Sequence, residues 1–193
     1  MSESDDPQYK SVNHALKCAF GNRAPYKSPS ITPSTGGGDG STWDERAGDA
    51  GNIKAEVRRT LEGVFLNVVH VLYIDELTDS PSEIEHLNKS MFELYERIQS
   101  ENSNADIAYV HHLVRLWAGI TDEVTYKGKT GPSTDDYWAE ALGVTTRTLR
   151  NWKGSGYTSG NNKRSGINDI LDRWLGTAIG ILKPVFRQNG WVE

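Results

Sequence analysis

The sequence has little of what secreted, redox-active or membrane-spanning proteins need. Its only cysteine is Cys18, which excludes an intramolecular disulfide and a cysteine-rich zinc site. No apolar run approaches the ~20 residues needed to cross a bilayer. The opening MSESDDPQYK has neither the basic nor the apolar segment of a signal peptide. We therefore expect a protein of the cytoplasm with no membrane partner.

Patterns that indicate catalysis or cofactor binding are also missing. The five histidines show neither the H-E-x-x-H nor the Cys/His spacing of zinc sites. The segment GGGDGS lacks the Lys-Ser/Thr of a phosphate-binding loop. Acidic pairs such as Asp135 and Asp136 are accounted for by helix ends, where carboxylates complement the helix dipole. The sequence predicts no enzyme, no metal site and no cofactor.

The net charge of −5 conceals an asymmetry along the chain. Residues 1–125 contain 11 Lys/Arg and 20 Asp/Glu, a balance of −9, whereas residues 126–193 contain 10 and 6, a balance of +4. From Thr145 to Arg164 there are five basic residues and no acidic one. A local positive segment beside an acidic body is typical of a protein whose one part meets a polyanion. A solvated basic loop is the alternative.

Strand signals are nearly absent, and the apolar residues follow the helical period. Spacings of three and four predict long helices over residues 53–73, 81–98, 107–117 and 167–186, the second with Asp79 or Ser80 as its cap. Residues 11–20 form a shorter amphipathic segment behind a Ser cap. The sequence therefore predicts an all-α fold.

Composition divides the chain into four regions. Residues 1–20 are an N-terminal helix that either docks late or serves as a detachable arm, and residues 21–51 are a flexible linker rich in Gly, Pro and Ser. Residues 52–125 form a helical body, and residues 126–193 hold the basic segment and a C-terminal helix. The helical stripes offer more apolar surface than one small core needs, so we expect a homodimer.

The stretch YWAEALGVTTRTLRNWKGSG, residues 137–156, joins two short apolar patterns at a glycine. Ala139 is the small residue where two helices approach, and Gly143 sits at a turn that favours a positive φ. Leu149 and Trp152 form the inward face of the second helix, and Thr145 or Thr146 caps it. This pattern resembles the helix-turn-helix of DNA-binding regulators.

The resemblance implies that the second helix faces double-stranded DNA. Arginine pairs with guanine and asparagine with adenine in the major groove, whereas Thr and Lys suit phosphates. The glycine-rich loop beyond this helix either follows the DNA backbone through two further basic residues or is a plain connector, which we favour. A structural helical hairpin with a polar face is the alternative to DNA binding. The candidate DNA-binding residues are Thr145, Thr146, Arg147, Arg150, Asn151, Lys153, Lys163 and Arg164.

The whole chain is similar to phage-encoded transcription regulators of the late-gene antiterminator class. That resemblance implies a sequence-specific regulator in the host cytoplasm, with host RNA polymerase or a sigma factor as partner. Two other hypotheses stay open. One is a DNA-packaging adaptor that resembles phage small terminase subunits, and the other is a helical protein that binds a host factor without DNA.

Overall fold

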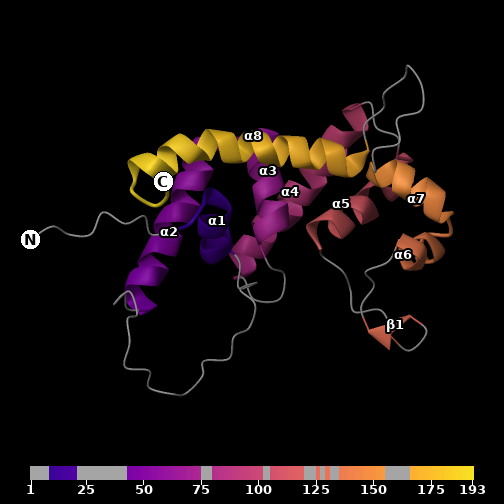
Figure 1. The fold of residues 1–193 in the computed structure, drawn as a ribbon, viewed down its shortest axis with the longest axis horizontal. Coiled ribbons are helices and arrows are strands. Elements are labelled where there is room, and N and C mark those ends of the chain that lie inside the picture. The colour runs from indigo at the N-terminus through magenta and orange to yellow at the C-terminus, as the bar shows by residue number, and fades with distance from the viewer. Residues whose placement is uncertain are drawn as a thin grey trace, which may run out of the picture.

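The fold is all-α, as the sequence predicts (Figure 1). A computed structural model describes residues 9–20, 43–74, 80–101, 105–119, 125–126, 129–130, 135–154 and 166–193. The helices are α1 (Val12–Phe20), α2 (Trp43–Thr60), α3 (Gly63–Tyr73), α4 (Pro81–Ser100), the 3₁₀ turn η1 (Ile107–Tyr109), α5 (Val110–Ala118), α6 (Asp135–Ala141), α7 (Thr146–Lys153) and α8 (Ile167–Gln188). None of the helices described is long and apolar enough to span a membrane.

The C-terminal helix α8 is the element on which most others pack. It contacts α1, α2, α3, α5 and α7, and Figure 1 shows it running along one side of the molecule. Its buried side chains recur at three and four residues, so one continuous stripe faces the other helices. The stripe consists of Ile167, Ile170, Leu171, Trp174, Ala178, Leu182 and Phe186. The sequence predicted this helix as part of region 126–193. In the structure it packs on helices of the body as well as on α7.

The predicted helix over residues 53–73 is two helices in the structure. The chain leaves helical geometry at Leu61 and Glu62, and Gly63 begins α3 with a φ of +54°. A glycine reaches that φ without the strain that a Cβ would cause. Leu61 stays buried in the break, so the apolar period continues across it. The period therefore predicted the buried face correctly but could not show the change of direction.

The predicted linker over residues 21–51 is also shorter than the composition indicates. Residues 21–42 lie outside the described residues, but α2 already begins at Trp43. The glycines and the absence of an apolar period in this stretch favoured a linker. Here intrinsic propensity was a weak guide to the structure.

The N-terminal helix α1 is part of the core rather than a detachable arm. Its five apolar side chains are at most 7% exposed, and Phe20 lies under the cations of Lys54 and Arg58, 5.4 and 5.9 Å from its ring centre. The Tyr9 amide donates to the Trp191 carbonyl at 2.8 Å. This hydrogen bond ties the start of α1 to the segment after α8.

Two details of the third predicted helix and the segment after it differ from expectation. Ile107 is 59% exposed instead of buried, because it lies in η1, whose tighter turn puts it out of register with α5. A two-residue ladder, β1 (Thr125–Tyr126) with β2 (Lys129–Thr130), follows α5. The sequence showed no hairpin there, and the ladder is too short to change the fold class.

Helix α4 begins where its capping signal predicts. The hydroxyl of Ser80 accepts from the amide of Glu83, and Pro81 occupies the first turn. Its predicted apolar stripe is buried at Leu87, Met91, Leu94 and Ile98 and half-buried at Ile84 and Tyr95. This stripe packs mainly on α3.

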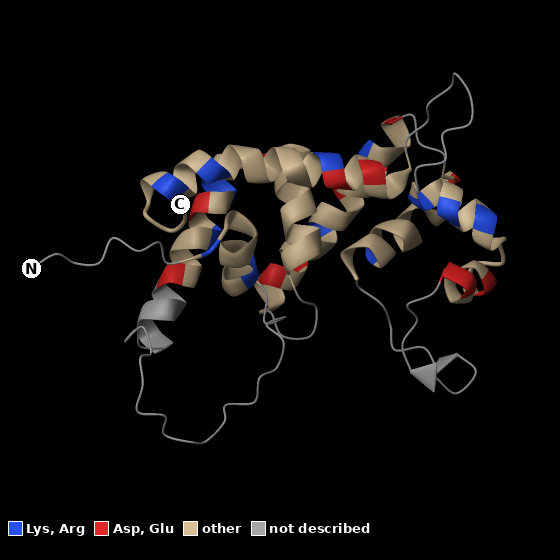
Figure 2. Ribbon diagram, in the orientation of Figure 1, with Lys and Arg blue, Asp and Glu red and all other residues tan. Residues whose placement is uncertain are grey.

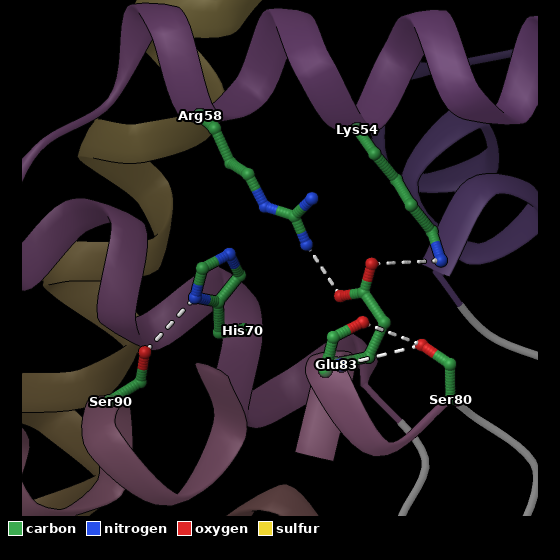
Figure 3. A network of polar contacts seen from close by, with 7 residues as sticks. Lys54, Arg58, His70, Ser80, Glu83 and Ser90 are labelled. Atoms are coloured by element: carbon green, nitrogen blue, oxygen red, sulfur yellow. Dashed lines mark hydrogen bonds and ion pairs between the residues drawn. The ribbon is translucent and has the colours of Figure 1, made fainter. Parts of the chain in front are cut away.

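A polar network around the buried Glu83 joins α2 and α4 (Figure 3). Glu83 is 9% exposed and accepts a hydrogen bond from Arg58, while the Lys54 ammonium lies 3.5 Å from its other oxygen. Burial raises the pKa of Glu83, but Arg58 and Lys54 outweigh this and leave the pKa below its ordinary value. Glu83 is therefore held as a carboxylate between two cations.

His70 lies beside this network in the interior. It is 2% exposed, and its Nδ1 pairs with the Ser90 hydroxyl at 3.0 Å. Burial, followed by the positive charge of Arg58 and then by His86, lowers the pKa of His70 to about 4. Within the described residues, Nε2 of His70 and Nε of Arg58 are buried without a hydrogen-bond partner. A neutral imidazole suits this position, since an imidazolium would add a third cation.

We predict that His70 makes the protein less stable in mild acid. Above pH 6.5 the imidazole is neutral in both states, but below it the unfolded chain takes up a proton and the native chain does not until about pH 4. The free energy of unfolding should therefore fall by up to about 3 kcal/mol across this window. Urea denaturation from pH 7 to pH 4 measures the fall.

His70→Asn separates this effect from all other titrations, because asparagine retains a partner for Ser90 and cannot titrate. The stability difference between wild type and variant should shrink as the pH falls from 6.5 to 4. Parallel stability curves for the two proteins would show that His70 does not titrate as described.

Candidate nucleic-acid interface

Helices α6 and α7 are joined by the tight turn that the sequence places at Gly143. The φ of Gly143 is +67°. Its amide donates to the Glu140 carbonyl at 3.1 Å, and the Val144 amide donates to the Ala139 carbonyl at 2.9 Å. These two bonds form a Schellman motif, which ends α6 with a left-handed glycine. The predicted turn and its positive φ are confirmed.

Helix α7 has the N-cap that the sequence left between two threonines. The Thr145 hydroxyl accepts from the Thr148 amide at 3.1 Å, so Thr145 is the cap. Thr146 is the first helical residue, and its hydroxyl instead donates to Asp136 at 2.8 Å. The cap and this cross-helix bond fix the start of α7 against α6.

The inward faces of α6 and α7 join the main core. Ala139 is 2% exposed and Leu149 is fully buried, both within the same apolar cluster as the body. Trp152 stacks on Tyr109 of η1, with ring centres 4.9 Å apart. Trp138 is half-buried against the cluster. The predicted inward positions are confirmed, and Tyr109 is a partner that the sequence did not indicate.

Two glycines bring the end of α7 against the start of α8. A Cβ on Gly166 would clash with the backbone of Gly154, and a Cβ on Gly154 would clash with the Asp169 carboxylate. Asp169 in turn accepts from the Gly166 amide at 3.2 Å, as the third residue of a helix often does. This contact was not predicted from the sequence, although a glycine three residues before an acidic residue at a helix start was a usable signal.

The outer face of α7 carries most of the predicted DNA-binding residues. Thr145, Arg147, Arg150 and Asn151 are exposed, and Thr146 and Lys153 are half-buried. Within the described residues Arg147 makes no ion pair. Lys163 and Arg164 lie outside the residues that the structure describes.

Asp135, in the first turn of α6, binds two of these basic residues. Its Oδ2 accepts from Nε of Arg150 at 2.9 Å, and its Oδ1 accepts from Nζ of Lys153 at 2.7 Å. The hydrogen bonds from Lys153 and then Arg150 lower the pKa of Asp135 below its ordinary value. From the sequence, Asp135 was expected only to complement the helix dipole. The partners are 15 and 18 residues away, and only the packing of the two helices brings them together.

Figure 2 shows the resulting charge distribution, with Lys and Arg on α7 and Asp and Glu on the adjacent α6. The described part of the chain contains no group of three His, Cys, Asp or Glu that could hold a metal ion. Comparison with family models, curated proteins and solved structures finds no match. The geometry of α6 and α7 therefore carries the functional argument by itself.

We predict that Gly166→Ala destabilises the protein by about 1–3 kcal/mol, because the added methyl group forces α7 away from α8. Guanidinium denaturation measures the change. The matched control is Gly180→Ala within α8, where a Cβ meets nothing within 4 Å. That variant should gain about 0.5–1 kcal/mol from helix propensity. Equal effects of the two substitutions would contradict the close glycine contact.

Proposed function

We propose that the protein is a sequence-specific, double-stranded DNA-binding transcription regulator that reads the major groove with α7. The observation that carries this proposal is the division of α7 into two faces. Leu149 is fully buried, while Arg147, Arg150 and Asn151 are exposed. These are the side chain types that recognise guanine and adenine edges.

The surroundings of α7 support the same proposal. A short helix can enter a major groove only if its supporting elements hold it firmly and leave one face open. The Schellman turn at Gly143, the Thr145 cap and the glycine contact between Gly154 and Gly166 hold α7 at both ends. The basic residues of α7 supply attraction to phosphates.

The resemblance to late-gene antiterminators extends the proposal to a protein partner. Residues 1–125 carry the excess of acidic residues, which makes them unsuited to DNA and available to a protein. We propose host RNA polymerase or its sigma factor as that partner, and a homodimer as the DNA-binding form. Light scattering with and without DNA measures the oligomeric state.

Selection of bound sequences from a random duplex pool tests the central proposal. A defined consensus supports a regulator. Binding to every duplex alike would instead favour the packaging adaptor, and no binding at low salt would favour the helical host-factor protein. A salt titration on the selected duplex then counts the phosphate contacts.

We predict that Arg147→Ala, Arg150→Ala and Asn151→Ala each weaken binding to the selected duplex by ~1–3 kcal/mol, because each loses a base contact. Binding to a scrambled duplex should change much less. If the loop that carries them follows the DNA backbone, Lys163→Ala and Arg164→Ala should weaken binding to both duplexes alike and lower the salt slope by about one unit each. If the loop is a plain connector, both variants should leave binding unchanged. Fluorescence anisotropy titrations measure all of these values.

Two controls accompany these variants. Lys17→Ala removes one positive charge from the exposed side of α1 and should change the affinity for neither duplex. Leu149→Ala should lower the free energy of unfolding by about 2–5 kcal/mol, because it leaves a cavity in the core. It should lose DNA binding only to the extent that it unfolds. The regulator proposal is wrong if folded Arg147→Ala and Arg150→Ala retain both affinity and sequence preference.

A further inference from the structure

Asp135 occupies both of its carboxylate oxygens with side chains of the proposed reading helix. One oxygen holds Arg150 through Nε, and the other holds the ammonium of Lys153. The exposed fractions of the three side chains differ: 25% for Asp135, 57% for Arg150 and 27% for Lys153. Arg150 is therefore anchored at one edge while more than half of it stays accessible.

Anchoring matters because an arginine reads a base only when its planar guanidinium is aimed along the base edge. A long side chain loses rotamer freedom when DNA fixes it, and that loss reduces affinity for the site. Asp135 belongs to another helix and restricts Arg150 before DNA arrives. An arginine that is already oriented therefore contributes more binding free energy at a matching base than at a phosphate of any sequence.

Lys153 is affected in the opposite sense. An ammonium 2.7 Å from a carboxylate is largely neutralised and has a partner to lose before it can bind a phosphate. Asp135 also adds negative charge beside α7. Both effects weaken binding that depends only on the DNA backbone.

We infer that Asp135 is a positioning residue that sets the sequence selectivity of α7, by orienting Arg150 toward bases and by withholding Lys153 from phosphates. This inference rests on the proposed function. It adds a residue outside the reading helix that raises the ratio of specific to non-specific affinity.

Asp136 provides a matched control for the charge. It lies in the same turn of α6 and carries the same charge, but its carboxylate contacts the Thr146 hydroxyl. Asp136→Asn therefore removes one negative charge from the same place without releasing Arg150 or Lys153. The difference between the two variants isolates the contacts of Asp135 from its charge.

The experiment measures dissociation constants of wild type, Asp135→Asn and Asp136→Asn for the selected duplex and for a scrambled duplex of equal length. For Asp135→Asn, we expect tighter binding to the scrambled duplex and unchanged or weaker binding to the selected one. The specificity ratio should fall at least about fivefold, the low end of the discrimination from one arginine–guanine pair. The salt slope should steepen by about one unit as Lys153 becomes available. Asp136→Asn should tighten both duplexes alike.

The inference is overturned if the two variants shift both duplexes equally, since Asp135 would then act through its charge alone. That result leaves the regulator proposal intact. A wild-type protein that binds both duplexes equally refutes the proposed function, and the inference with it.

Circular dichroism melting checks that each variant is folded. If Asp135→Asn does not fold, Asp135→Glu decides, because it keeps the charge and Arg150 but moves the carboxylate by one methylene group. Its specificity ratio should fall, and an unchanged ratio overturns the inference.

Discussion

The buried stripe of α8 is the interaction on which the rest of the structure depends. Within the described residues, α8 packs against α1, α2, α3, α5 and α7, the last of which carries most of the candidate DNA-binding residues. None of these short helices would be stable alone, because helices of this length gain most of their stability from tertiary packing. Trp174, Leu182 and Phe186 are buried in this shared stripe. The described elements share one core because a single helix runs beside most of them.

Much of this fold can be predicted from the sequence, because apolar residues spaced three and four apart mark the buried face of a helix. The stripe of α8 and the Ser80 cap of α4 are local signals, and the structure bears out both. The break at Gly63 is different, since a change of chain direction preserves the apolar period and depends on one residue's φ. The early start of α2 at Trp43 went undetected for a related reason, because glycine-rich composition gives no apolar period to follow.

The candidate site divides in the same way. Gly143 and Leu149 could be assigned from sequence, and the cap could be narrowed to Thr145 or Thr146, because a turn, a cap and an inward position each have a local requirement. The link from Asp135 to Arg150 and Lys153 could not, since it exists only once α6 and α7 are packed. Its consequence is that charge on the outer face of α7 is smaller than the composition of that segment indicates. Counting basic residues overestimates the field that a polyanion would meet.

The length of α8 sets the distance between the elements at its two ends. It has 22 residues and is therefore roughly 33 Å long. Its N-terminal end meets α7 through the contact of Gly166 with Gly154, and its other end lies beside α1 and α2 (Figure 1). This length is close to one helical turn of B-DNA, ~34 Å. In the function proposed above, a protein bound at α1 and α2 would lie roughly one DNA turn along the molecule from the bases that α7 contacts. The length of α8 therefore sets the distance between α7 and the end of the molecule that α1 and α2 form.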